Sequence, residues 1–94
     1  MESSAVRAHV VVRGRVQMVG FREFARRHAR AAGLHGTVRN APDGSLECVI
    51  EGPGPDVARV IEQLHAGPSH ARVDRVDFEY EPAVGGLPPI TVTA

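Results

Sequence analysis

Strand-like and helix-like segments follow one another along this chain in an order that constrains its fold more than any other feature. Apolar residues at alternate positions are typical of strands with one face on a core. The strand-like segments are residues 6–13, 34–40, 45–51 and 72–81. Apolar residues at helical spacing occupy 21–32, before Gly33, and recur from Pro55 to a stop before Gly67. The predicted order is strand, helix, strand, strand, helix, strand.

This order predicts an α+β fold of the ferredoxin-like, split βαβ type. We expect an antiparallel sheet of four to five strands with two helices packed on one face, residues 90–93 supplying the fifth strand. The expected core positions in the strands are Val6, Ala8, Val10, Val12, Leu46, Cys48, Ile50, Val76, Phe78 and Tyr80. Those in the helices are Phe21, Phe24, Ala25, His28, Ala32, Val57, Val60, Ile61 and Leu64.

Size and composition limit the classes of function. A chain of 94 residues predicts one domain over residues 1–94, with 1–5 as a disordered tail. Eleven basic and eleven acidic residues give zero formal net charge, so there is no general attraction for nucleic acid or an anionic membrane. Cys48 is the only cysteine, and no segment reads as a signal peptide or a membrane span. We therefore expect a cytoplasmic monomer that binds neither nucleic acid nor a membrane.

Residues 14–20 form a glycine-bearing loop between the first strand and the first helix. The first N–H groups of a helix lack intrahelical partners, and the helix dipole adds partial positive charge there. Arg22 falls in the first helical turn, where its guanidinium can fold back over the same space. Backbone donors and one arginine together predict a pocket for a phosphate-sized dianion.

Asn40 ends the second strand, directly before the turn Ala41-Pro42-Asp43-Gly44. A side chain at this position can project past the edge of the sheet. On position alone, Asn40 is as compatible with a polar strand end that satisfies the turn as with a ligand-binding residue.

The chain resembles the acylphosphatase family. The resemblance covers roughly residues 6–80, and two segments about twenty residues apart carry most of it. The matching segments are residues 14–22 (GRVQMVGFR), residues 36–40 (GTVRN) with Asp43-Gly44, and residues 71–74 (ARVD).

The resemblance implies hydrolysis of acyl phosphates to carboxylate and inorganic phosphate, without a metal or an organic cofactor. Arg22 would bind the phosphate, and Asn40 would hold the attacking water. The backbone N–H groups of Gln17, Met18, Val19, Gly20 and Phe21 would form the phosphate cradle. The substrate would be a small acyl phosphate, with inorganic phosphate or sulfate as a product-like ligand.

Met18 departs from the family pattern, because a glycine usually stands at this position. If the backbone there has positive φ, methionine costs roughly 1–2 kcal/mol relative to glycine. A second departure is Thr37, which replaces a usual aromatic residue, and a third is the segment 90–94, which lacks the family's aromatic finish.

The alternative interpretation is a non-catalytic phosphate-binding or regulatory domain of the same fold. RNA-binding modules of this topology stack bases on aromatic residues of the sheet. The four aromatic residues here, Phe21, Phe24, Phe78 and Tyr80, are all predicted to face the core, which disfavours RNA binding.

Overall fold

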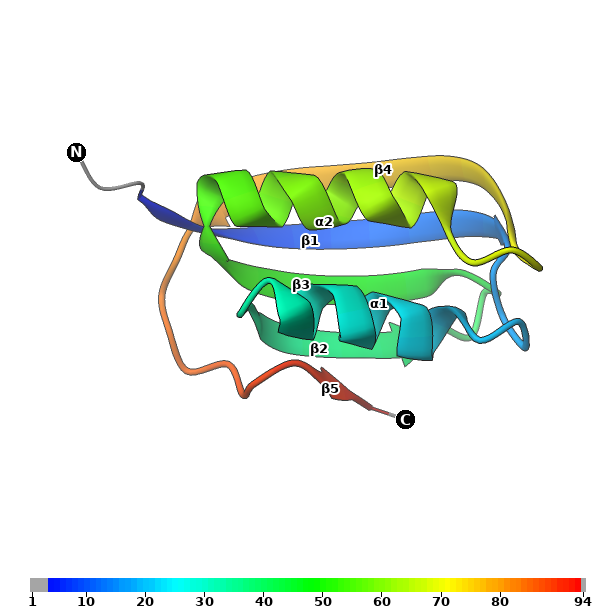
Figure 1. The fold of residues 1–94 in the computed structure, drawn as a ribbon, viewed down its shortest axis with the longest axis horizontal. Helices are drawn as coiled ribbons and strands as arrows, with labels where there is room; N and C mark the ends of the chain where they lie inside the picture. Colours follow the sequence, from blue (N-terminus) through cyan, green and yellow to red (C-terminus); the bar gives the residue numbers. More distant parts are fainter. Residues whose placement is uncertain (1–3, 94) are drawn as a thin grey trace.

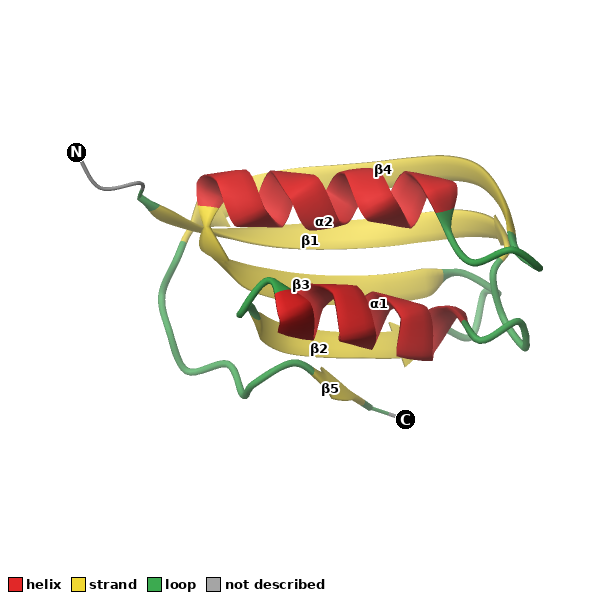
Figure 2. Ribbon diagram, in the orientation of Figure 1, coloured by secondary structure: helices red, strands yellow, loops and turns green. Residues whose placement is uncertain are grey.

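The computed structural model describes residues 4–93, which form a five-stranded sheet with both helices on one face (Figures 1 and 2). The elements in chain order are β1 (Ala5–Arg15), α1 (Phe21–Ala31), β2 (His35–Asn40), β3 (Leu46–Pro53), α2 (Gly54–Ala66), β4 (Arg72–Pro82) and β5 (Thr91–Val92). The predicted ferredoxin-like α+β fold is confirmed. No helix in this part of the chain is long and apolar enough to cross a membrane.

The strands lie in the order β4-β1-β3-β2-β5. The four long strands pair antiparallel, as predicted, but β5 pairs parallel with β2, so the sheet is mixed. The connection after β4 runs around the end of the sheet where β2 begins (Figure 1). The Gly36 N–H of β2 donates a hydrogen bond to the Pro88 carbonyl of this connection. The predicted antiparallel arrangement is therefore right for the four long strands and wrong for β5, which runs in the same direction as β2.

The core lies between the helices and the sheet. The predicted alternation is confirmed on β1 and β3, and the α2 stripe is buried. Phe78 and Tyr80 lie opposite Val10 and Ala8 of β1, and paired residues share a face, so their side of the sheet was predicted correctly. They are nevertheless 44% and 47% exposed, because β4 is the outer strand of the sheet. Their assignment to the core is therefore wrong.

The ends of several elements differ from the prediction. β1 continues through Arg15, with an irregularity in its pairing between Arg13 and Gly14, so the loop before α1 begins only at Val16. Ala5 is not part of a tail, because it pairs with Pro53 of β3. The rest of the predicted tail, apart from Ser4, lies outside the described residues.

Two glycines shape the connection between α1 and β2. Gly33 follows the helix with φ of 73°, which confirms the predicted left-handed cap. Gly36, in β2, has φ of 150°, and a Cβ built there would lie 1.8 Å from the Val49 carbonyl oxygen. Only glycine therefore lets β2 approach β3 this closely.

Candidate active site

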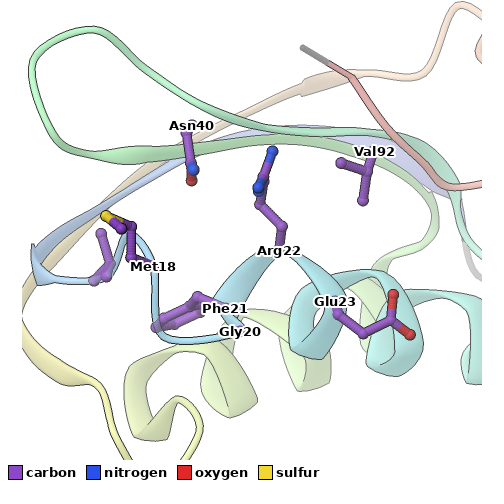
Figure 3. Close-up of a pocket in the computed structure, with 8 residues that line it drawn as sticks. Met18, Gly20, Phe21, Arg22, Glu23, Asn40 and Val92 are labelled. Carbon is purple, nitrogen blue, oxygen red and sulfur yellow. The ribbon is translucent and has the colours of Figure 1, made fainter.

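An open pocket of about 360 Å³ lies where the loop before α1, the first turn of α1, the end of β2 and β5 meet (Figure 3). It brings together the two side chains that the sequence singled out, Arg22 and Asn40. Its lining residues are Val16, Met18, Gly20, Phe21, Arg22, Glu23, Asn40 and Val92. The two candidate residues, eighteen positions apart in sequence, thus share one pocket.

The loop before α1 is anchored at both ends and tied to the β2–β3 turn. Val16 and Phe21 are buried in the core. The Gln17 side-chain amide donates to the Ala41 carbonyl at 2.8 Å and to the Ser45 carbonyl at 3.1 Å. The loop that supplies the backbone N–H groups is thereby fixed relative to Asn40, the residue before Ala41.

The predicted cradle residues lie at the pocket to different extents. Met18, Gly20 and Phe21 line it, whereas Gln17 and Val19 do not. The Gln17 side chain is turned to the β2–β3 turn, and Val19 packs against the core. The roles of their backbone N–H groups stay predictions.

Met18 has φ of 62°, and its side chain is 99% exposed. The condition under which methionine is costly at this position is therefore met. The residue lines the rim of the pocket in an unfavourable backbone conformation that no packing of its side chain offsets.

Arg22 is available for an anion. Within residues 4–93, seven of the eleven arginines form an ion pair with a carboxylate. Arg22 is one of the four that form none, and no other residue in this range makes a hydrogen bond to its side chain. The one acidic residue in the pocket lining, Glu23, is occupied, because Arg26 donates to both its oxygens at 2.9 and 2.7 Å. This hydrogen bonding and the positive charges of Arg26 and Arg27 lower the pKa of Glu23. Figure 3 shows Glu23 pointing away from Arg22 and Asn40.

Asn40 points into the pocket from β2, opposite the first turn of α1 (Figure 3). Its Oδ1 atom is buried and accepts no hydrogen bond from the described part of the chain. A buried acceptor without a donor costs about 1–3 kcal/mol, so native proteins contain few such atoms. In particular, the Asn40 Oδ1 atom accepts no hydrogen bond from the turn that follows it.

The turn after Asn40 is held by Asp43. Its Oδ1 atom accepts hydrogen bonds from the Ser45 N–H at 2.9 Å and the Ser45 hydroxyl at 2.6 Å, and its Oδ2 atom accepts one from Arg13 at 3.2 Å. The Ser45 hydrogen bonds, together with Arg13, lower the pKa of Asp43 from 3.8 to about 2. The carboxylate form is thus the one that fits the turn.

Protonation of Asp43 is expected to loosen this turn in acid. The pKa of Asp43 is lower in the folded chain than in the unfolded one. The ionised carboxylate therefore stabilises the fold fully above about pH 3.8, and this stabilisation is lost as the pH falls toward about 2. We expect Asp43→Asn to lower the urea midpoint at pH 7, and its difference from the unmodified protein to shrink between pH 4 and pH 2. Asp74→Asn, at an exposed carboxylate, controls for net charge. A difference that grows toward pH 2 would contradict the assignment.

Cys48 takes no part in the pocket. It is buried in the core, and burial raises the pKa of its thiol to about 12. The prediction that this residue is a small buried hydrophobe is confirmed.

Sequence reasoning missed two features of the site. The Gln17 side-chain link to the turn depends on three segments meeting in space, and no local pattern indicates it. The second feature is Val92, which lines the pocket from β5. In the sequence, only its position two residues after the apolar Ile90, which is buried, indicates that its side chain lies on the core side of the sheet.

Comparison with known proteins shows the family of this chain. A family model described as Acylphosphatase matches residues 8–86. An acylphosphatase from Thermococcus kodakarensis is 51% identical over 80 residues, which cover 85% of this chain and 88% of that protein. One from Roseiflexus sp. is 48% identical over 79 residues, 84% of this chain and 85% of that protein. The crystal structure of acylphosphatase from Bacillus subtilis superposes with a TM-score of 0.91 at 28% identity, covering 95% of this chain and 99% of that one. The chain belongs to the acylphosphatase family.

Proposed function

We propose that the hydrolysis of acyl phosphates, the activity of this family, takes place in the pocket between Arg22 and Asn40. The observation that supports this most directly is that Arg22 and Asn40, whose buried Oδ1 atom has no hydrogen-bond donor among the described residues, line the same small pocket. The Arg22 side chain, which has no carboxylate partner within residues 4–93, projects from the first turn of α1 toward β2, and the Asn40 side chain points into the same pocket. This is a place where a tetrahedral anion and a water molecule complete the hydrogen bonding.

Arg22 and the loop bind the phosphoryl group. The guanidinium offers a planar fork that matches two phosphate oxygens, and the N–H groups at the start of α1 offer further donors. In phosphoryl transfer these donors stabilise the charge on the equatorial oxygens of the transition state.

Asn40 orients the attacking water. Its amide does not titrate usefully, so it cannot act as a general base, but Oδ1 can accept a hydrogen bond from a water molecule. The water oxygen forms a bond to phosphorus while the bond from phosphorus to the acyl oxygen breaks. The carboxylate leaves with the electron pair, and the water proton passes to a phosphate oxygen or to solvent. Because a carboxylate is a good leaving group, the reaction needs little general acid.

Asn40→Ala is expected to lower kcat for benzoyl phosphate by about 100- to 1000-fold, the usual effect of removing one preorganised group from such a site. Binding of inorganic phosphate, measured by calorimetry, is expected to persist because Arg22 and the loop remain. Thr37→Ala is the matched control, since it shortens a polar side chain on the opposite face of β2. Near-normal turnover in a folded Asn40→Ala protein would contradict the role of Asn40.

The same experiment separates the enzyme from a non-catalytic phosphate-binding domain. Turnover that is lost with Asn40 identifies an enzyme, whereas phosphate binding without turnover in the unmodified protein identifies a binding domain. Cytoplasmic location, a monomeric state, a single domain over residues 1–94 and the absence of a cofactor stay predictions.

A further inference from the structure

β5 forms one wall of the pocket. Val92 pairs with Val38 of β2, and Thr91 pairs with Thr37. Paired residues lie on the same face of the sheet, so Val92 lies on the helix side, diagonal to Asn40 on the neighbouring strand. Val92 is 38% exposed. Figure 3 shows Asn40 and Val92 on either side of the Arg22 side chain.

The connection that delivers β5 is fixed at several points. Glu51 of β3 accepts hydrogen bonds from the Val84 and Gly85 N–H groups, both at 3.1 Å, and from Arg7 at 3.0 Å. Burial opposes the ionisation of Glu51, but these donors together lower its pKa. Ile90 is buried, and the Thr93 N–H donates to the Val38 carbonyl at 2.8 Å. These contacts hold Val92 in a fixed position in the pocket wall.

Among the residues that line the pocket, Arg22 is the one with a cationic side chain, and in the proposed function it binds the phosphoryl group. Of the other lining side chains, Asn40 holds the water and Glu23 is bound by Arg26. The remaining side chains are apolar: Val16, Met18, Phe21 and Val92. Among the residues that line the pocket, nothing complements a second negative charge on the substrate.

We propose that Val92 is a specificity-determining residue that contacts the acyl group, and that this enzyme prefers apolar, uncharged acyl groups to acyl groups with a second carboxylate. The inference rests on the proposed function and deepens it. In an in-line displacement the leaving group departs on the side opposite the water. With the water at Asn40, the acyl group extends past Arg22 to the side where Val92 lies.

The test compares benzoyl phosphate with succinyl phosphate, which carries a free carboxylate. The unmodified enzyme is expected to show a kcat/KM at least about 10-fold higher for benzoyl phosphate, the scale of discrimination by an apolar pocket. Val92→Lys places a cation beside the acyl group and is expected to reduce this ratio about 10-fold or more. Val92→Thr, of nearly the same shape, is expected to lower kcat/KM for benzoyl phosphate more than kcat/KM for succinyl phosphate.

Val84→Lys is the matched control, because it adds the same charge at a valine that is 76% exposed and outside the pocket lining. Equal ratios in the Val92→Lys and Val84→Lys enzymes, or no preference in the unmodified enzyme, would overturn the inference while leaving acyl phosphate hydrolysis intact. Failure to hydrolyse either substrate would instead overturn the proposed function.

Discussion

Arg22→Lys is expected to lower kcat/KM for benzoyl phosphate by about 100- to 1000-fold, although it keeps the positive charge. A lysine ammonium is a point charge and cannot reproduce two parallel hydrogen bonds to a phosphoryl group. Loss of one preorganised donor in a site of this kind costs about 2.7–4 kcal/mol in the barrier. Steady-state kinetics give the change in kcat/KM, and phosphate inhibition reports ground-state binding.

Arg27→Lys is the matched control for this change. Arg27 lies in the same helix and is exposed, and it does not line the pocket. We expect its kinetics to match those of the unmodified enzyme. If Arg22→Lys lost less than about 10-fold with its fold intact, bidentate binding of the phosphoryl group by Arg22 would be wrong.

Gly36→Ala is expected to reduce the free energy of unfolding by about 2–5 kcal/mol. The estimate combines the usual cost of overpacking with that of an L-residue at positive φ. The added methyl group would overlap the Val49 backbone, which cannot move aside without separating β2 from β3. A domain of this size has roughly 5–15 kcal/mol in total, so a large part of its stability would be lost. Urea denaturation measures the change.

Gly33→Ala separates the two causes. Gly33 also has positive φ, at 73°, but a Cβ there meets nothing within 4 Å. We expect it to cost only about 1–2 kcal/mol, the conformational part of the effect. Equal losses for Gly33→Ala and Gly36→Ala would show that the close approach of β2 to β3 is not what requires glycine.

Much of the fold could be predicted because its determinants are local. The α2 stripe and the alternation of β1 and β3 reflect a single buried face, which periodicity records directly. Phe78 and Tyr80 show the limit of this reasoning. Their parity indicates the correct side of the sheet, but burial also depends on which strand lies at the edge, and that depends on the order of all five strands. The direction of β5 likewise depends on the path of the connection before it.

The candidate site likewise combines features that are local in sequence and can be predicted with long-range contacts that cannot. Arg22 and the loop before α1 are close in sequence, so their proximity follows from the start of one helix. The meeting of Arg22 with Asn40 was implied by the family resemblance, and the structure places both in one pocket. The Gln17 link to the β2–β3 turn and the Glu51 contacts with the connection to β5 are long-range contacts. No pattern within a single segment encodes them.

The left-handed backbone of Met18 has a consequence for which amino acids this loop can accept. Since the side chain is surrounded by solvent, packing places no limit on its size, and backbone torsion becomes the main restriction on which residue fits. Glycine and asparagine satisfy that restriction readily, whereas valine, isoleucine and threonine do not. We therefore expect this exposed position to tolerate fewer amino acids than an ordinary surface position does.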